Sequence, residues 1–344
     1  MHTSLLSRRR FVKSAAFAGA AVCGFPFVRA ATPPALGQGD FRYRVVPGWG
    51  VLDGATPVNN GHGLVRDREG HIILLTDHLK NNVIVYDQQG KLLHKWGTTF
   101  PGAHGLSIVS EGTRQVLYIT DLKTHRVSKT TLNGTLLQEW LWPKETGKYT
   151  AEDQYRPSWT LHLPDGGFFV LDGYGRDYIL RYSAEGKLLK TFGGAEGGIV
   201  HWGPHGGMVD GTTNPTLLIA MSDQQHLLRL SLTGEKRQQI DLPGGNPRQI
   251  RRHGEHYFVA HLGDNWPKNP DCRGFVSVLD AGMRVVSNIA GTAPVYDDAG
   301  KLQPMRHQEE IFRHPHDLIV DDDGSLYVAQ FSSGQTYPIK LERI

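Results

Sequence analysis

The stretch FRHPHDLIVDDDGSLYVAQ, residues 312–330, decides the fold class of this chain. It places Pro-His-Asp immediately before an alternating apolar strand, which is followed by an Asp-Asp-Gly turn at residues 322–324 and a second apolar run at residues 326–329. Two apolar runs joined by a turn of this kind predict a β-hairpin.

Five further copies of this hairpin lie upstream. They read GHGLVRDREGHIILLTD at 61–77, AHGLSIVSEGTRQVLYITD at 103–121, RPSWTLHLPDGGFFVLD at 156–172, PHGGMVDGTTNPTLLIAMSD at 204–223 and, more weakly, PRQIRRHGEHYFVAHLGD at 247–264. A third strand and a turn follow, as at residues 83–90, and then a fourth strand. Four strands per unit, repeated every 40 to 50 residues or so, are typical of propeller blades. The sequence therefore predicts an all-β, six-bladed β-propeller with four-stranded blades.

The two ends of the repeat array predict how the ring closes. The last copy ends at residues 337–341 without a fourth strand, while the alternating segment FRYRVV, residues 41–46, has no hairpin of its own. We expect residues 41–46 to complete the last blade. The insert at residues 291–313 is expected to be a loop over one face, which leaves residues 31–344 as a single domain.

Residues 1–30 are predicted to be a twin-arginine secretory signal. Arginines at 8–10 precede Phe11, and an apolar run at residues 15–27 leads to a cleavage site expected after Ala30 or Ala31. A membrane anchor is the alternative, but the run is shorter than the roughly 20 residues that cross a bilayer. We expect export to the periplasm or beyond, and no membrane span in the mature chain. Export of folded protein by this route is compatible with a bound metal.

The composition of the mature chain points away from nucleic acid. The predicted signal carries five of the 37 Lys and Arg residues and none of the 34 Asp and Glu residues, which leaves a formal charge of −2. This balance offers no basic surface to nucleic acid. Cys272 is the only cysteine after residue 30 and is expected to be an inert loop thiol. We expect a monomer whose partner is a small-molecule or peptide substrate.

The residue that opens the innermost strand of each copy is here called the opening residue. The opening residues of copies one to six are His62, His104, Ser158, His205, Arg248 and His316. The innermost strands of a propeller line its central channel, so these residues are expected to converge at one mouth. Four imidazoles among six such positions exceed what surface loops carry by chance.

Three of these histidines predict a metal site on the propeller axis. His104, His205 and His316 belong to alternate copies, so a closed ring would space them three-fold around the axis. Three neutral imidazoles with an open fourth position suit a catalytic zinc. A single histidine of this kind is more often a turn residue bonded to its neighbour. Use of His62 as a fourth ligand would suit copper or iron as well as zinc.

Asp317 and Tyr174 are further candidates near the channel. Asp317 would either hold backbone amides across the channel or bind a calcium ion deeper in the core, because calcium prefers oxygen ligands. Tyr174 lies between two glycines after the second strand of copy three. A phenol beside a cationic metal loses its proton more readily and can act as a base, although packing is the commoner role of a tyrosine.

These motifs resemble the lyase domain of peptidylglycine α-amidating enzymes, a six-bladed propeller of the NHL-repeat type. The resemblance covers nearly the whole mature chain and is sharpest at HGLSI from His104, TDLKTHRV from Thr120, DGYGRDYI from Asp172, GPHGG around His205 and PHDLIVDDDGSLYVA from Pro315. It implies zinc ligands at His104, His205 and His316, a catalytic tyrosine at Tyr174, and a calcium ligand at Asp317 aided by the carbonyls of Leu64 and Leu106.

Two departures from the family pattern affect the expected substrate. Where the family has arginines after the second strands of copies one and four, this chain has Asp77 and Ser222. The family arginines would bind the carboxylate and hydroxyl of the substrate, so their loss predicts a different substrate. The mouth instead gains His62, Asp77, His78 and Arg248. Arg248 would either restore one positive charge or pair with an acid such as Asp77.

The sequence thus predicts a secreted metal-dependent lyase in which the metal polarises a substrate hydroxyl or carbonyl and Tyr174 transfers a proton as a C–N or C–O bond breaks. The strict family substrate is an α-hydroxyglycine-capped peptide. A lyase or hydrolase acting on another small hydroxylated or keto compound is the broader expectation, with His62 or His78 as an additional ligand or acid–base group. A non-catalytic binding platform is the alternative, because propellers host many functions.

Overall fold

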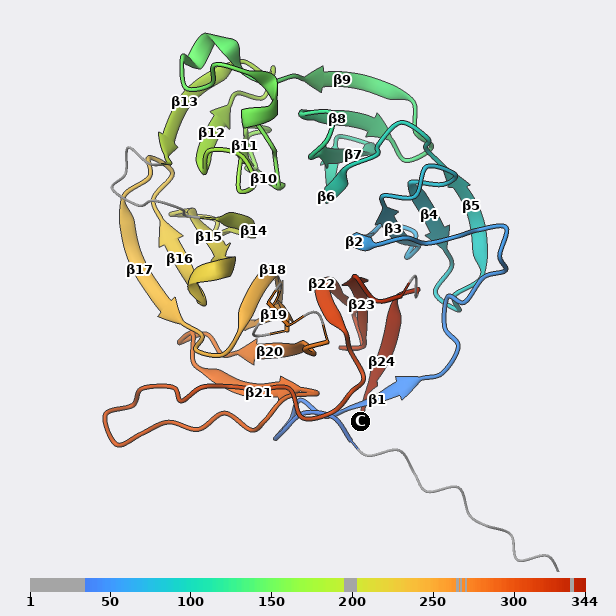
Figure 1. Ribbon diagram of the computed structural model, residues 1–344, viewed down its shortest axis with the longest axis vertical. Coiled ribbons are helices and arrows are strands. Elements are labelled where there is room, and N and C mark those ends of the chain that lie inside the picture. The colour runs from blue at the N-terminus through green and yellow to red at the C-terminus, as the bar shows by residue number, and fades with distance from the viewer. Residues whose placement is uncertain (1–34, 195–202, 264–265, 267, 270, 335–336) are drawn as a thin grey trace, which may run out of the picture. The chain divides into compact units, whose positions relative to one another are not determined.

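Six four-stranded antiparallel sheets form a ring in the computed structural model, which describes residues 35–344 except 195–202, 264–265, 267, 270 and 335–336 (Figure 1). The predicted all-β, six-bladed propeller is confirmed. The predicted signal at residues 1–30 lies outside the described residues. Within the described ranges, no helix has the length and apolar character needed to cross a membrane.

Blades 1 to 5 are each built from four consecutive strands, ordered from the axis to the rim. Blade 1 contains β2 Gly61–Arg66, β3 Ile72–Thr76, β4 Val83–Tyr86 and β5 Leu92–Trp96, and blade 2 contains β6 Ala103–Glu111, β7 Arg114–Asp121, β8 Arg126–Thr131 and β9 Leu136–Trp140. Blade 3 contains β10 Trp159–His162, β11 Phe168–Leu171, β12 Tyr178–Tyr182 and β13 Leu188–Gly193. Blade 4 contains β14 Pro204–Asp210, β15 Thr216–Met221, β16 His226–Leu230 and β17 Lys236–Asp241, and blade 5 contains β18 Asn246–His253, β19 His256–Leu262, β20 Phe275–Leu279 and β21 Val285–Ile289. Short 3-10 helices lie at η1 Lys144–Thr146, η2 Glu152–Gln154 and η4 Ser222–Gln224.

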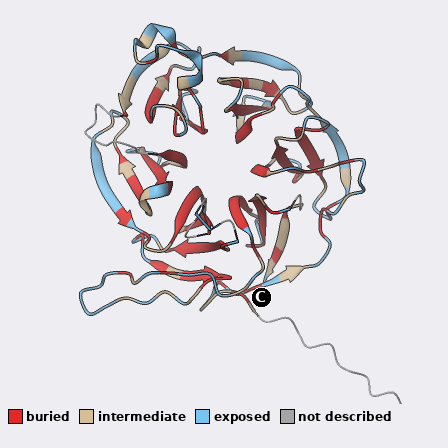
Figure 2. Ribbon diagram, in the orientation of Figure 1, coloured by how far each residue is buried: buried red, intermediate tan, exposed pale blue. Residues whose placement is uncertain are grey.

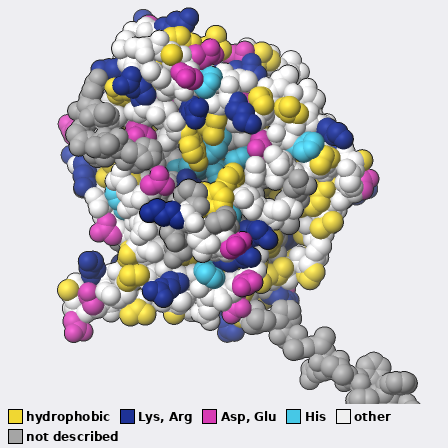
Figure 3. Space-filling view, viewed as in Figure 1, with side chains coloured by type: hydrophobic (Ala, Val, Ile, Leu, Met, Phe, Trp, Pro, Cys, Tyr) yellow, Lys and Arg dark blue, Asp and Glu magenta, His cyan; other side chains and the backbone are white. Residues whose placement is uncertain are grey.

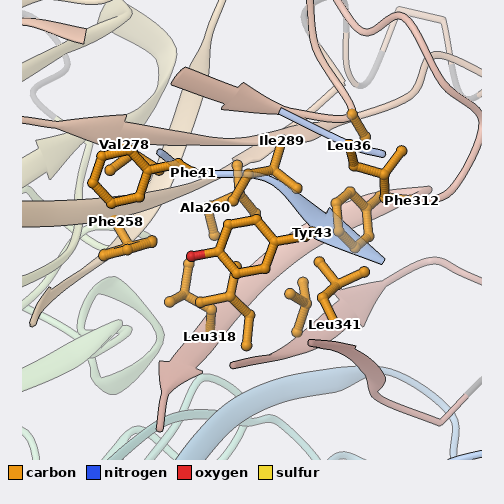
Figure 4. Close-up of a cluster of buried hydrophobic side chains, with 14 residues drawn as sticks. Leu36, Phe41, Tyr43, Phe258, Ala260, Val278, Ile289, Phe312, Leu318 and Leu341 are labelled. Carbon is orange, nitrogen blue, oxygen red and sulfur yellow. The ribbon is translucent and has the colours of Figure 1, made fainter. Parts of the chain in front are cut away.

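Blade 6 closes the ring with strands from distant parts of the chain. It contains β22 His314–Val320, β23 Leu326–Phe331 and β24 Ile339–Arg343, and its outermost strand is β1 Tyr43–Val46. β1 runs antiparallel to β24, with Tyr43 opposite Arg343. The Tyr43 ring is buried in an apolar cluster that includes Leu318 and Leu341 (Figure 4). The predicted closure by the segment at residues 41–46 is confirmed.

The hairpin that identified the repeat is formed by β22 and β23. Its turn is closed by a hydrogen bond of 2.9 Å from the Gly324 N–H to the Asp321 carbonyl. Gly324 has a φ of 82°, a left-handed conformation that glycine adopts without the steric cost a side chain would add.

Each pair of neighbouring blades shares an apolar core. Between blades 1 and 2, for example, Val65, Ile73 and Leu75 pack with Leu117 and Ile119. Corresponding clusters lie between the other neighbouring blades. A sheet inside the ring has a neighbour on both faces, so its inner strands are buried on both. This explains why strands such as β3 (IILLT) and β15 (TLLIAM) read as continuous apolar runs instead of alternating ones.

Burial falls from the axis to the rim (Figure 2). The strands β2, β3 and β4 are almost wholly buried, whereas β5 and β17 carry mostly exposed side chains. Outermost strands are sheet edges, and charged side chains such as Lys236 and Arg237 on β17 oppose edge-to-edge association. The inner strands therefore provide both the core and the positions that face the axis.

The insert at residues 291–313 is a loop, as expected, although it also contributes to the core. Two isolated bridges, Gly291 with His307 and Tyr296 with Leu302, give it local order. Leu302 and Met305 are buried against the cluster between blades 4 and 5. The thiol of Cys272 is buried and is not part of a disulfide.

Candidate metal centre

A β-bulge in the innermost strand aims most opening residues at the axis. In β2, β6, β14, β18 and β22 the pairing register shifts across the opening residue; in β22 the shift lies between Pro315 and Asp317, so His316 has no partner on β23. A bulge redirects the extra side chain and bends the strand locally. Blade 3, which opens with Ser158, shows no such shift between β10 and β11. The same local device therefore presents the four histidines and Arg248.

The four predicted imidazoles meet at the mouth of the channel. The ring centroids of His104, His205 and His316 are each 4.8 Å from the other two. The His62 centroid is 5.0 Å from that of His104 and 4.9 Å from that of His316. His104 and His316 are thus the central pair, flanked by His62 and His205. Figure 3 shows histidine side chains gathered in a hollow at the centre of this face.

Backbone carbonyls of the next blade orient three of the rings. The Nδ1 atoms donate hydrogen bonds from His104 to Ser158 O at 2.9 Å, from His205 to Arg248 O at 2.9 Å and from His316 to His62 O at 2.7 Å. In every case the acceptor is the opening residue of the following blade. A ring whose Nδ1–H is bonded to a carbonyl keeps a lone pair on Nε2, which is the form of histidine that binds metal ions.

The unpaired nitrogens of this cluster fit a metal ion. His104 Nε2 and His62 Nδ1 are buried and have no hydrogen-bond partner. His62, His104 and His316 each offer a nitrogen, and these nitrogens all lie within 4.8 Å of one another. Burial lowers the pKa of His104, His205 and His316 well below the ordinary value, and nearby rings and Arg248 lower it further. The rings are therefore neutral, as ligands of zinc, copper or iron must be.

Tyr174 occupies the remaining nitrogen of His205. The Tyr174 hydroxyl lies 3.0 Å from His205 Nε2. Because His205 Nδ1 already donates to a carbonyl, the tyrosine hydroxyl is the donor in this bond. His205 Nε2 is therefore already hydrogen-bonded, and His205 is not one of the three histidines whose nitrogens lie within 4.8 Å of one another. The structure therefore brings together all four imidazoles and Tyr174, and it offers two overlapping sets of three possible ligands.

The loop after β11 holds Tyr174 at the mouth. Asp172 accepts two backbone N–H bonds, at 2.6 and 2.8 Å, and a bond of 2.9 Å from the Tyr149 hydroxyl. A Cβ added to Gly173 would lie 2.1 Å from the Pro204 carbonyl oxygen, so glycine is required for this close approach to blade 4. Burial raises the pKa of Tyr174, although 40% of the residue is exposed. The hydroxyl thus points into the cluster while part of the ring faces solvent.

Asp77 is an anion held beside His62. Its Oδ2 lies 3.8 Å from His62 Nε2, and its carboxylate accepts bonds of 3.0 Å from the Asn60 backbone and side-chain amides. Burial raises the pKa of Asp77, but the bonds and charge from His62 and the Asn60 amides outweigh this effect and lower it to about 2. Among the described ion pairs, Asp77 pairs with His62 and not with Arg248.

His78 does not join this group. Its Nδ1 accepts a bond of 3.1 Å from the Lys80 N–H, and its own N–H donates to the Thr76 hydroxyl at 3.0 Å. These bonds stabilise the turn after β3. His78 is not among the residues that line the pocket at the mouth, so the structure gives no support to the expected acid–base role.

Three of the imidazoles, those of His62, His104 and His316, line a pocket of about 340 Å³. Its polar lining consists of His62, His104, His316, Tyr174, Asp223 and Arg248, and its apolar lining of Leu122, Leu262, Trp266 and Phe331. Arg248 is only 6% exposed, and its Nε has no hydrogen-bond partner. The pocket thus combines a cation, possible metal ligands and aromatic walls.

The predicted calcium position below the imidazoles is filled by an arginine. Arg251 bonds both oxygens of Asp317, with Nη2–Oδ2 at 2.6 Å and Nε–Oδ1 at 3.0 Å. The Leu64 carbonyl, expected as a second calcium ligand, accepts a bond of 3.0 Å from Arg251 Nη2, and Leu106 pairs with Ile119 in the β6–β7 ladder. The guanidinium thus bonds both Asp317 and the Leu64 carbonyl, two of the groups expected to bind calcium, and calcium at this position stays a prediction that would require Arg251 to move. The other role considered for Asp317, holding backbone amides, is present: it accepts bonds of 2.8 Å from the N–H groups of Leu64 and Leu318.

Sequence reasoning missed Arg251 and the apolar wall of the pocket. The segment PRQIRRH places charged residues in an innermost strand, and a charge in a buried strand requires a partner; this signal could have identified Arg251. Trp266 lies in the irregular segment after β19 and Phe331 at the end of β23. Trp266 has no counterpart in the repeat, whereas Phe331 follows Gln330 as Asp77 follows Thr76 in the equivalent register of blade 1, so the repeat could have identified Phe331.

Comparisons with known proteins reproduce the fold at low sequence identity. No protein-family model and no curated protein sequence matches the chain. The structure is similar to a streptogramin B lyase (TM-score 0.57, 13% identity, covering 87% of this chain and 97% of that one). It is also similar to a virginiamycin B lyase from Staphylococcus aureus (TM-score 0.55, 14% identity, 88% and 100% covered) and to a gluconolactonase from Xanthomonas campestris (TM-score 0.57, 12% identity, 90% and 98% covered). These likenesses support the propeller architecture; the specific resemblance to amidating lyases stays a prediction.

Proposed function

We propose that this chain is a metal-dependent enzyme of the lyase type that acts on a small molecule in the pocket at the mouth of the channel. The observation that carries the proposal is the group of four buried imidazoles, three of them tethered through Nδ1, with buried nitrogens that have no partner. A scaffold that binds partners through its rim has no need of such a group on its axis.

His104 and His316 are the proposed central ligands, because they belong both to the three-fold set and to the set whose nitrogens lie within 4.8 Å. His62 or His205 would supply the third nitrogen. An unsatisfied buried polar atom costs about 1–3 kcal/mol, and a bound ion would offset that cost. We propose zinc, with copper or iron as alternatives that the same donors accept. An ion bound there would act as a Lewis acid toward a substrate oxygen.

Tyr174 is the proposed proton-transfer residue. Its hydroxyl already acts as a donor toward His205, and its ring lines the pocket. Because burial raises the pKa of Tyr174, the phenol keeps its proton at neutral pH in this state. A protonated group within hydrogen-bond reach of the substrate suits donation to a leaving nitrogen or oxygen.

The substrate is proposed to differ from that of the amidating lyases. Asp77, at one expected arginine position, is bonded to Asn60. Ser222, at the other, donates its hydroxyl to the Pro247 carbonyl at 2.9 Å. Neither position supplies a cation. The names of the structural neighbours, two lyases and a gluconolactonase, support C–N or C–O bond cleavage in a small molecule, with lactone hydrolysis as the nearest related reaction.

Metal analysis of the mature protein, purified after expression in zinc-replete medium, tests the proposal. We expect about one equivalent of bound ion, lost in His104→Ala and in His316→Ala. His261→Ala is the matched control, because His261 is equally buried and bonds Ser277 outside the cluster; it should keep the ion. A wild-type protein without stoichiometric metal would instead support a non-catalytic binding platform.

Tyr174→Phe tests the proton-transfer role separately. With a small hydroxylated or keto compound that the wild type converts, we expect the turnover of Tyr174→Phe to be lower by about 100-fold or more, while the bound metal is retained. Full activity in Tyr174→Phe would refute the assigned role and leave the metal proposal intact.

Export by the twin-arginine route remains part of the proposal, on the strength of residues 8–10 and the apolar run that follows. Replacement of the three arginines by lysine should keep the full-length protein in the cytoplasm of its producing cell. Unchanged export in a cell fractionation experiment would count against this route.

A further inference from the structure

Arg248 is a buried cation without an anionic partner among the described residues. It is more than nine-tenths buried, and its Nε has no hydrogen-bond partner. No ion pair of the described residues includes its guanidinium. A charge removed from water is costly unless it is paired, so this arrangement is unfavourable for a structural arginine.

Two other arginines, which are partly exposed, have such a partner. Arg229 lies 2.5 Å from Asp210 and Arg251 lies 2.6 Å from Asp317. Neither of two acids at the mouth forms an ion pair with Arg248 among the described residues: Asp77 is bonded to Asn60 and pairs with His62, and Asp223, which lines the pocket, is engaged in an interaction of its own. The missing anion is therefore expected to come from a ligand.

The position of Arg248 is fixed relative to the imidazoles. Its carbonyl accepts the Nδ1–H of His205 at 2.9 Å, and a register shift between Pro247 and Gln249 leaves Arg248 as the bulged residue of β18. Both features fix the backbone of Arg248, and its side chain lines the pocket that contains His62, His104 and His316. A ligand group bound by Arg248 would thus lie beside the proposed metal centre.

The apolar part of the pocket lining indicates the character of the rest of the ligand. Trp266 and Phe331 pack edge to face, with ring centroids 5.4 Å apart, and Phe331 also contacts His62 at 5.6 Å. Leu122 and Leu262 complete the apolar lining. Apolar walls of this kind hold the hydrophobic part of a ligand, while a few polar groups fix its orientation.

We propose that Arg248 recognises the anionic group of the substrate, and that the substrate is a small carboxylate with an aromatic or aliphatic body. The inference rests on the proposed function, because a carboxylate bound by Arg248 is a substrate only if the protein is the proposed enzyme. A guanidinium binds a carboxylate through two parallel hydrogen bonds. Phosphate carries more charge and is usually met by several cations or backbone N–H groups; Arg248 is the one Lys or Arg among the described residues that line this pocket.

Titration calorimetry on the purified, metal-loaded protein tests this assignment with phenylacetate, phenylacetamide, acetate and phenyl phosphate. Phenylacetate should bind about tenfold or more tighter than its neutral amide, since a hydrogen bond to a charged group contributes about 1.5–3 kcal/mol. Acetate, which has no apolar body, should bind more weakly than phenylacetate. Tighter binding of phenyl phosphate than of phenylacetate would overturn the choice of carboxylate.

Variants of Arg248 connect the preference to this residue. Arg248→Gln should remove the preference for phenylacetate over phenylacetamide while the metal content and the melting temperature remain unchanged. Arg248→Lys should retain part of it. Arg237→Gln, which removes an exposed arginine on β17, is the matched control and should bind like the wild type. A preference that survives in Arg248→Gln would overturn the inference.

The same titrations after removal of the metal by a chelator separate this inference from the proposed function. If the wild type binds no metal but still prefers phenylacetate through Arg248, the anion site stands and the enzyme proposal fails. If the preference disappears with the metal and is unaffected by Arg248→Gln, the ion binds the carboxylate and the role of Arg248 is refuted.

Discussion

Arg248 and Arg251 lie three residues apart on β18, yet their surroundings are opposite. The Arg251 guanidinium bonds both oxygens of Asp317 and the carbonyls of Leu64 and Leu318. Arg248, at the mouth of the same channel, has a buried Nε without any partner. The protein itself supplies the hydrogen-bond partners of Arg251, whereas Arg248 is proposed to bind the anionic group of a ligand.

The difference extends to the regions around the two residues. The lower channel connects β18 of blade 5 to β22 of blade 6 and β2 of blade 1 through Arg251, and so contributes to holding the ring together. The upper pocket keeps unpaired nitrogens on His62 and His104. Proteins accept such local costs mainly at functional sites, where a ligand later satisfies the unpaired groups. The contrast separates a structural region from a functional one within a single strand.

The largest expected effect on the free energy of unfolding comes from breaking the pair of Arg251 and Asp317. Arg251→Met would leave the fully buried Asp317 without its cation; because the Arg251 side chain is 26% exposed, we expect a cost at the lower end of the range for a buried pair, about 3 kcal/mol. Burial raises the pKa of Asp317, so proton uptake would recover part of the loss. Urea unfolding at pH 7 measures it, with the exposed Arg237→Met as control. A loss below about 1 kcal/mol would show that the pair is not the structural element described here.

Asp172 extends the comparison to a buried acid that has hydrogen-bond donors but, among the described residues, no cationic partner. Burial raises its pKa to about 7, although the bonds from the Arg156 and Arg176 amides and the Tyr149 hydroxyl lower it. The folded protein therefore retains a proton that the unfolded chain has released, so this group stabilises the fold at low pH and less so as the pH rises toward 7. We expect its contribution to fall by about 2 kcal/mol between pH 5 and pH 7.

Urea unfolding at pH 5, 6 and 7 measures this slope. Asp172→Asn cannot titrate and should give a flatter dependence than the wild type, whatever its absolute stability. Parallel curves for the two proteins would mean that Asp172 stays ionised throughout, as its three hydrogen bonds alone would favour.

The smallest expected effect on stability is that of replacing Arg248, and it tests whether the two arginines change the free energy of unfolding in opposite directions. Arg248→Met removes a buried cation without a partner, so the free energy of unfolding should be unchanged or higher by up to about 1 kcal/mol. This is the opposite direction from Arg251→Met on the same strand. A destabilisation of similar size in both variants, measured under the same conditions, would show that Arg248 is also a structural residue.

The fold and the convergence of the site could be predicted because both follow from the repeat. Each hairpin occupies an equivalent place in the ring, so residues in equivalent positions, such as His104 and His316, necessarily meet near the axis. The lone strand at residues 41–46 and the incomplete last blade fit only each other. These conclusions need the order of elements and no side-chain detail.

The partners of individual atoms could not be predicted in the same way. The bulges at the opening residues break the alternation along β18 and β22, so counting along the strand does not tell that Arg251 meets Asp317, 66 residues away. The bond between Tyr174 and His205 also depends on a close approach between blades at Gly173. Such contacts are decided by the angle between neighbouring sheets.

The pairing of β1 with β24 makes the last blade depend on segments almost 300 residues apart, with Tyr43 opposite Arg343. During synthesis β1 therefore stays unpaired until β24 has left the ribosome. The entropy of joining such distant segments grows only slowly, by about 0.6 kcal/mol for each doubling of length, so four paired residues and one buried tyrosine can hold the closure. A nascent or carboxyl-terminally shortened chain that lacks β24 would therefore expose the unpaired edges of β1 and β23, which are sites for association with other chains.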